Sequence, residues 1–160
     1  MQETSDTEVL ATVAASNGRR FLGIGLLAFL GVLVIYVAIV APPSFGWQLF
    51  LIAIGASSLM IADAMRRSTV HRLELTKTEL RDSGGLTIAE VDNIVSIDRG
   101  AFAFKPSNGF LLRLQEPVER KWCPGLWWRF GRRVGVGGMT PGRQTKYMSE
   151  IIAVMLAERS

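Results

Sequence analysis

The sequence predicts an α-helical transmembrane hairpin followed by a small α+β domain, and three observations carry this prediction. No Asp, Glu, Lys, Arg or His occurs among the 42 residues from Phe21 to Ala62. From Val70 onward, apolar and polar residues alternate as they do in half-buried strands. Near the C-terminus the apolar residues change to helical spacing. The chain of 160 residues thus divides into an N-terminal tail (1–20), a hairpin (21–65) and a C-terminal domain (66–160).

The uncharged segment is too long for one spanning helix and suits two, since roughly 20 apolar residues cross the hydrocarbon core of a bilayer. We expect the spans at Phe21–Ala41 and at about Trp47–Ala64. Between them, Pro42 and Pro43 end the first helix and Gly46 loosens the turn. Both spans should be helical, because hydrocarbon offers no hydrogen-bond partner to a free backbone amide.

Arginine pairs flank this hairpin and predict its orientation. Arg19 and Arg20 precede the first span, Arg66 and Arg67 follow the second, and the loop between the spans is uncharged. Because cytoplasmic loops of membrane proteins carry an excess of Lys and Arg, we expect both termini to be cytoplasmic. Asp63 lies one turn before the second pair and is expected to be its ion partner at the membrane edge.

Cleavage of the first span as a signal peptide is an alternative. Residues 39–41, Ile-Val-Ala, loosely resemble a cleavage site. However, the preceding region is long and acidic, and the apolar run exceeds the usual core of a signal peptide.

Short strands are predicted for the first part of the C-terminal domain. Val70–Thr76 alternates, with Leu73 and Leu75 on one face. A second strand should begin at Glu79 and end at Asp82, before a Ser-Gly-Gly turn. The further segments are an apolar series at 88–97, then 101–104, 110–115 and 129–136.

An amphipathic helix is predicted to end the chain and to pack on the sheet. Thr140 is a suitable N-cap, and Pro141 suits the first helical position. The apolar stripe of this helix consists of Tyr147, Met148, Ile151, Ile152 and Met155.

With this order of elements the chain resembles the bacterial pleckstrin-homology-like (PH-like) domains found beside transmembrane hairpins. Three segments carry the resemblance, namely HRLELTKTELRDSGG, IAEVDNIVSID and RRVGVGGMTPGRQTKYMSEIIAVML. The resemblance covers roughly residues 70–158. It implies a curled antiparallel sheet or partial barrel with a C-terminal helix, in a protein of the bacterial cytoplasmic (inner) membrane. Some relatives help to assemble membrane complexes.

The chain departs from the phosphoinositide-binding members of that family. Their basic signature between the first two strands is missing here, where Lys77 and Arg81 stand alone. Recognition of one particular lipid headgroup is therefore not expected from the resemblance.

A basic and aromatic segment between Arg120 and Lys146 is the sharpest local feature. It holds seven Lys or Arg and no acid in 27 residues, with Trp122, Trp127, Trp128 and Phe130 among them. Such a mixture suits the bilayer interface, where the cations meet anionic headgroups. We expect Trp127, Trp128, Arg129, Arg132 and Arg133 to form an exposed contact surface for the membrane or for a membrane-bound protein.

Two other interpretations of this segment stay open. The tryptophans could belong to the core while the arginines are solvated, or the mixture could bind single-stranded nucleic acid, which beside a membrane anchor is the weaker alternative. The charge balance favours an anionic lipid surface, because residues 66–160 hold 16 Lys or Arg against 10 Asp or Glu.

No catalytic, metal-binding or cofactor-binding pattern is recognised in the sequence. The single histidine, His71, has no nucleophile motif beside it, and the single cysteine, Cys123, offers no metal spacing. The glycine-rich run 135–142 lacks the Walker A residues and is expected to be a strand-to-helix turn.

The expected function is that of a non-catalytic, membrane-anchored adaptor or assembly factor that binds a protein partner at the membrane surface. The alternative is a small accessory subunit of a larger membrane complex, held mainly by its two helices. Both hypotheses place the chain in the lipid bilayer beside a membrane protein partner and require no cofactor.

Overall fold

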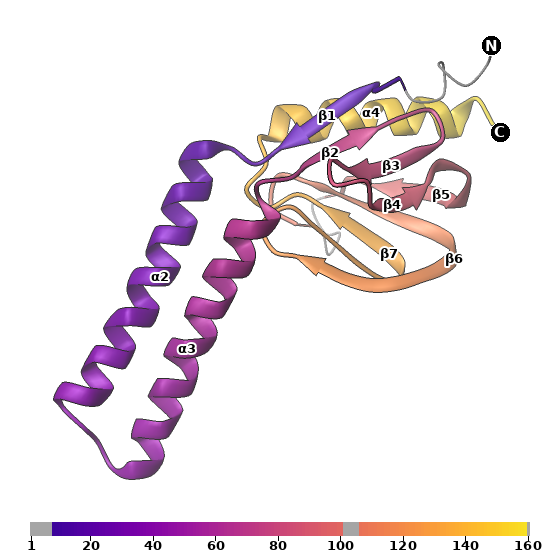
Figure 1. The fold of residues 1–160 in the computed structure, drawn as a ribbon. Coiled ribbons are helices and arrows are strands. Elements are labelled where there is room, and N and C mark those ends of the chain that lie inside the picture. Colours follow the sequence, from indigo (N-terminus) through magenta and orange to yellow (C-terminus); the bar gives the residue numbers. More distant parts are fainter. Residues whose placement is uncertain (1–7, 101–105, 160) are drawn as a thin grey trace. The chain divides into compact units, whose positions relative to one another are not determined.

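A computed structural model describes residues 8–100 and 106–159, which form two compact units. One unit is a helix pair over residues 17–67, and the other is a sheet domain built from residues 8–16 and 68–159. The strand expected at 101–104 lies outside the described residues. The elements in chain order (Figure 1) are β1 (Ala11–Ala14), α2 (Asn17–Val40), α3 (Phe45–Ser68), β2 (Arg72–Leu75), β3 (Glu79–Asp82), β4 (Thr87–Glu90), the 3-10 helix η1 (Val91–Asn93), β5 (Ile94–Asp98), β6 (Phe110–Cys123), β7 (Trp127–Val136) and α4 (Gly142–Ala157).

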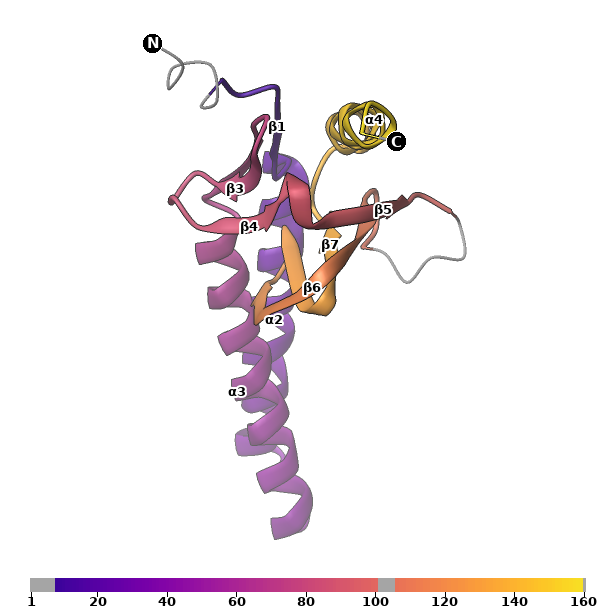
Figure 2. The ribbon, with the colours of Figure 1, turned by 90° about the vertical axis from the view of Figure 1, so that its right-hand side faces the viewer.

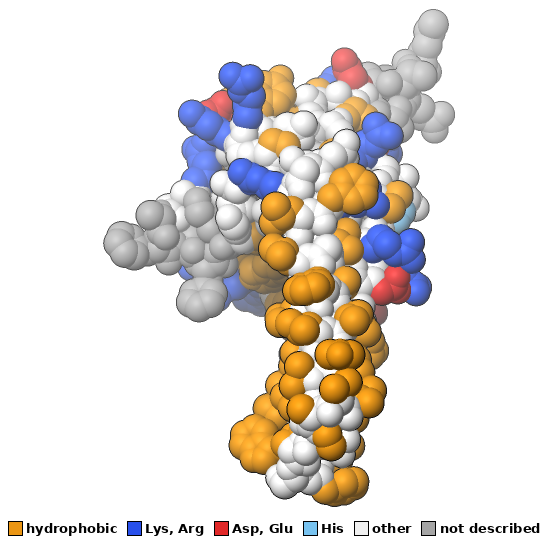
Figure 3. All heavy atoms as spheres, turned by 90° about the vertical axis from the view of Figure 1, so that its left-hand side faces the viewer, with side chains coloured by type: hydrophobic (Ala, Val, Ile, Leu, Met, Phe, Trp, Pro, Cys, Tyr) orange, Lys and Arg blue, Asp and Glu red, His pale blue; other side chains and the backbone are white. Residues whose placement is uncertain are grey.

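The helix pair confirms that two long apolar helices follow one another in the chain. Helices α2 and α3 contain 24 residues each and are long and apolar enough, by length and composition, to cross a membrane. Helix α2 begins four residues before the predicted span and ends one residue earlier, at Val40, whereas α3 extends beyond its predicted span at both ends. In Figure 3, hydrophobic side chains cover the face of the helix pair that is in view along most of its length.

Glycines bring the two helix backbones close together. A Cβ atom at Gly55 would lie 2.9 Å from the carbonyl oxygen of Gly31, and one at Gly31 would lie 2.9 Å from that of Gly55. Hydrogen bonds cross the same interface, because Ser58 donates to the carbonyl of Leu27 at 2.8 Å and Gln48 to that of Ala38 at 3.0 Å. Small residues and hydrogen-bonding side chains are the usual means of packing helices in lipid.

The domain consists of two antiparallel sheets and one C-terminal helix, which confirms the coarse α+β class. The first sheet has the order β1-β2-β3-β4 and the second has the order β5-β6-β7 (Figure 2). The strand from Glu79 to Asp82 has the bounds that the sequence predicts. The sixth strand is much longer than the expected 110–115 segment, because it pairs with β7 as far as Cys123.

Strand β1 corrects the expectation that residues 1–20 form a tail outside the domain. Its register aligns Ala11 with Leu75 and Val13 with Leu73, on the strand that follows the helix pair. The amide of Leu10 also donates to the carbonyl of Leu75 at 2.7 Å. The two helices are therefore inserted in the chain between two neighbouring strands of one sheet.

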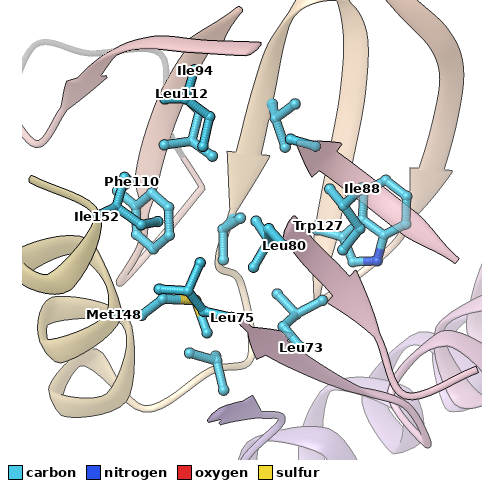
Figure 4. Close-up of a cluster of buried hydrophobic side chains, with 14 of the residues drawn as sticks. Leu73, Leu75, Leu80, Ile88, Ile94, Phe110, Leu112, Trp127, Met148 and Ile152 are labelled. Carbon is cyan, nitrogen blue, oxygen red and sulfur yellow. The ribbon is translucent and has the colours of Figure 1, made fainter. Parts of the chain in front are cut away.

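A single hydrophobic core joins both sheets and the final helix (Figure 4). Met148 and Ile152 of α4 are fully buried against side chains from the strands, among them Leu75 and Phe110. Val13 of β1 is equally inaccessible to solvent. Every strand of the domain contributes at least one buried apolar side chain to this cluster.

Helix α4 starts one residue later than expected, and its buried apolar stripe is narrower than expected. Pro141 occupies the N-cap position and the helix begins at Gly142. The hydroxyl of Thr145 fastens this end by donating to the carbonyl of Asn108 at 2.6 Å. Tyr147, assigned to the apolar stripe by its spacing, is 57% exposed and lies off the core-facing side.

The placement of β1 predicts that Val13→Asp destabilises the sheet domain, whereas Thr12→Asp does not. Val13 is fully buried and Thr12 is exposed on the same strand. An unpaired carboxylate in the core should cost roughly 3 kcal/mol or more of unfolding free energy. Thermal unfolding of the full chain in mild detergent, followed by near-UV circular dichroism, measures the difference. Equal melting temperatures for the two variants would contradict the membership of β1 in the domain.

Candidate functional site

The candidate site lies on the hairpin formed by β6 and β7. Pro124, Gly125 and Leu126 connect the two strands, and the amide of Leu126 donates to the carbonyl of Cys123 at 3.1 Å. Gly125 has a φ of +83°, a conformation that glycine adopts without strain. The hairpin places Trp122 directly opposite Trp128.

Strand alternation divides the predicted contact residues between two faces, so the prediction is wrong for two of the five. Side chains of successive strand residues point to opposite faces. Trp127 is 1% exposed and Arg129 is 8% exposed, and both belong to the inner face. Trp128 is partly exposed, and Arg132 and Arg133 are exposed. Figure 4 shows Trp127 within the buried cluster.

Arg129 connects the two sheets instead of forming part of a contact surface. Its Nη1 donates to the carbonyl of Thr87 at 2.8 Å and to that of Ile88 at 3.4 Å. Both acceptors belong to β4, the edge strand of the first sheet. The guanidinium carbon lies 5.7 Å from the centre of the Trp127 ring, which keeps the buried cation over an aromatic face.

An exposed hollow of about 440 Å³, the aromatic hollow, is lined by Trp122, Trp128, Phe130 and Arg133. The rings of Trp128 and Phe130 meet edge to face with centres 6.0 Å apart, and the guanidinium carbon of Arg120 lies 5.8 Å from the Phe130 ring centre. Any Cβ at position 135 would overlap the Trp128 ring, so Gly135 allows that ring to lie against the strand. Trp122 is 57% exposed and Phe130 is 50% exposed.

A second hollow of about 290 Å³, the arginine hollow, adjoins the first through Arg133. It is lined by Val95, Arg113, Leu114, Arg132 and Arg133. Arg132 and Arg133 are both exposed although they are consecutive, because Gly131 interrupts the alternation with a φ of +56° where the register shifts. Arg113 on β6 is aligned directly with Arg133 on β7.

The arginine pairs that are expected to flank the membrane lie at the ends of the helix pair. Arg19 and Arg20 belong to the start of α2, and Arg66 and Arg67 to the last turn of α3. Asp63 accepts hydrogen bonds from Arg66 at 2.9 Å and from Arg67 at 2.7 Å, which confirms the predicted ion pairing. Exposed pairs of this kind contribute little to stability.

The glycine-rich run before α4 is a strand-to-helix turn, as predicted. Its amides are used inside the domain. The amide of Gly137 donates to the carbonyl of Leu126 at 2.9 Å, and that of Gly138 to the carbonyl of Ser107 at 2.8 Å. The amide of Met139 donates to the carbonyl of Gly125 at 2.9 Å. These hydrogen bonds hold the β6–β7 turn and the loop before β6 against the start of the helix.

The thiol of Cys123 is poorly suited to nucleophilic chemistry. It is half-buried, and burial raises the pKa of Cys123 above its ordinary value. Because the thiolate is the reactive form, a raised pKa lowers the reactive fraction at neutral pH. His71 is exposed in the segment before β2.

Sequence reasoning missed the contributions of Val95 and Arg113 to the site. Both are separated in sequence from the basic and aromatic segment and reach it only through the pairing of β5, β6 and β7. The sequence does contain a signal that places Trp127 and Trp128 on opposite faces. A strand is expected from Arg129 onward, and extending its alternation toward the N-terminus separates these two side chains.

The two faces of the hairpin predict opposite effects for two tryptophan substitutions. Trp127→Ala should cost about 3–5 kcal/mol of unfolding free energy, because it leaves a cavity in the core. Trp122→Ala, on the exposed face, should change stability by less than about 1 kcal/mol. Urea unfolding of the full chain in mild detergent measures both. A larger loss for Trp122→Ala than for Trp127→Ala would reverse the assignment of the faces.

The hairpin surface therefore combines exposed aromatic rings with exposed guanidinium groups. Rings offer apolar contact area at low entropic cost, and guanidinium groups bind carboxylates and phosphates. Comparison with protein-family models, with curated proteins and with solved structures finds no match for this chain.

Proposed function

We propose that this chain is a non-catalytic, membrane-anchored adaptor or membrane-complex assembly factor of the bacterial cytoplasmic membrane. Its sheet domain binds a protein partner at the membrane surface. The observation that carries the proposal is the aromatic hollow, an exposed group of rings on the sheet domain. The chain of this domain leads directly into the apolar helix pair after β1 and returns from it before β2.

Membrane anchoring is supported by the length and the surface of the helix pair. At 1.5 Å per residue, 24 residues extend about 36 Å, enough for a hydrocarbon core of about 30 Å. Large apolar side chains are exposed along both helices, including Phe29 at 66% and Leu49 at 60%. Exposed apolar surface of this extent is costly in water and favourable in lipid.

Chain connectivity supports a topology in which both ends of the helix pair lie on one side of the membrane. Only residues 15 and 16 separate β1 from α2, and only residues 69–71 separate α3 from β2. Since β1 and β2 are hydrogen-bonded neighbours, two crossings of the membrane are compatible with this sheet and a single crossing is not. The arginines at both ends favour the cytoplasm for that side.

The arrangement of the domain also supports the PH-like assignment. Two antiparallel sheets of four and three strands, followed by a C-terminal helix, agree with the order of elements implied by the resemblance. In this proposal the helix pair is an insertion between the first two strands of the PH-like fold.

Partner binding is assigned to the aromatic hollow because of its composition. Interface hot spots are enriched in Trp, Tyr and Arg, and they need exposed apolar area that can become fully desolvated. Trp122, Trp128 and Phe130 supply that area, and Arg120 and Arg133 border it. An apolar side chain of the partner, flanked by a carboxylate, would match this chemistry.

Capture of the partner is expected to depend on the exposed rings. We expect Trp122→Ser combined with Phe130→Ser to reduce the recovery of a partner cross-linked in native membranes and purified in mild detergent by about tenfold. Tyr147→Ser is the matched control, because Tyr147 is an aromatic residue of α4 that is 57% exposed. Undiminished capture by the double variant, with a complex that depends on the helix pair alone, would favour the accessory-subunit alternative.

The topology is tested by labelling with a membrane-impermeant thiol reagent. In a Cys123→Ser background, Ser44→Cys in the α2–α3 loop should react in intact cells, and Lys77→Cys in the domain should react only after lysis. Lys77 serves as the domain site because it is exposed, whereas Cys123 is half-buried and has a raised pKa. Labelling of Lys77→Cys in intact cells would overturn the cytoplasmic placement of the domain.

A further inference from the structure

Three exposed arginines gather on the outer face of the β5-β6-β7 sheet. Arg113 and Arg133 are directly opposite one another on paired strands, and Arg132 is the neighbour of Arg133. Among residues 8–100 and 106–159, no carboxylate forms an ion pair with any of the three. The arginine hollow is thus a concentrated positive charge on the domain.

This arrangement is unfavourable for the domain by itself. Like charges directly opposite on neighbouring strands destabilise a sheet. The first sheet instead places opposite charges on directly aligned residues. Arg81 is aligned with Glu74 and donates a hydrogen bond to its carboxylate at 3.3 Å. The repulsion between Arg113 and Arg133 would be relieved by an anionic ligand that both guanidinium groups could share.

We infer that the arginine hollow docks the domain on the anionic lipid bilayer in which the helix pair is anchored. Guanidinium groups present planar forks of N–H donors that fit phosphate oxygens. Val95 is 60% exposed beside the three arginines and adds apolar area for the boundary between headgroups and acyl chains. The ligand is the headgroup layer of many lipids and not one selected headgroup.

Tethering explains why a bilayer is favoured over a soluble anionic protein. The inference rests on the proposed membrane anchoring, in which connections of two and three residues hold the domain beside the headgroups at high effective concentration. Each cation near such a surface strengthens binding by about fivefold before salt screening. The adjoining aromatic hollow shares Arg133, so lipid docking would also hold the partner-binding rings at the membrane surface.

The experiment uses the full chain in nanodiscs of phosphatidylcholine, alone or mixed with anionic phosphatidylglycerol. In a Cys123→Ser background, Val95→Cys carries a fluorophore beside the arginine hollow, and lipids with a nitroxide on the headgroup quench it on contact. We expect roughly threefold stronger quenching in the anionic discs than in the neutral discs, and loss of this difference at high salt. A fluorophore on Tyr147→Cys in α4 should show no difference between the two discs.

Two matched triple variants distinguish docking by the arginine hollow from a general effect of the net charge of the domain. Arg113→Gln with Arg132→Gln and Arg133→Gln should abolish the difference at position 95. Arg72→Gln with Lys77→Gln and Arg143→Gln removes the same net charge from exposed positions outside the hollow and should preserve it. Equal quenching in both kinds of disc, or an equal loss in both triple variants, would overturn the inference.

Two further outcomes identify which proposal has failed. Failure of the wild-type chain to enter nanodiscs would reject the membrane anchoring on which the proposed function and this inference both depend. Normal insertion with no lipid dependence, together with intact partner capture, would reject lipid docking and leave the adaptor proposal standing. An acidic protein as the ligand would appear as capture that is sensitive to the first triple variant in neutral and anionic discs alike.

Discussion

The pairing of β1 with β2 organises the sheet domain. It joins two segments separated by the whole helix pair, from Ala11 aligned with Leu75 to Ala14 aligned with Arg72. The pairing buries Val13 in the core and gives the first sheet its outer strand. It also positions the final helix, since the side chain of Gln144 accepts a hydrogen bond from the Ala14 amide at 3.0 Å.

The same pairing makes the helix pair an insertion in the sheet domain. A hairpin at the end of a chain can be an anchor with an independent domain attached to it. Here the two helices interrupt a sheet, so a domain lacking residues 8–16 would leave the edge of β2 and part of the core uncovered. The stability of the domain therefore depends on the segment that precedes α2.

The β6–β7 hairpin shows how one composition can serve two purposes. Its tryptophans suit a core, a membrane interface or a partner by their chemistry, and the alternation of the strand assigns each side chain to one face. Trp127 and Arg129 complete the interior, where Arg129 satisfies carbonyls at the edge of β4. Trp128 and Phe130 remain outside, and the positive φ of Gly131 adds Arg132 and Arg133 to the exposed face.

Elements with local signals could be predicted from the sequence. The uncharged run predicted the two apolar helices, and helical spacing predicted the buried Met148 and Ile152. Period-two alternation predicted the strand that holds Leu73 and Leu75, and a following turn signal placed the end of the next strand at Asp82. The meeting of distant segments, by contrast, is visible only in the folded chain. Ala11–Ala14 is too short to specify a strand without β2, and Arg113 joins Arg133 only through strand register. Backbone pairing acts between segments far apart in the chain, whereas hydrophobic period and charge are properties of neighbouring residues.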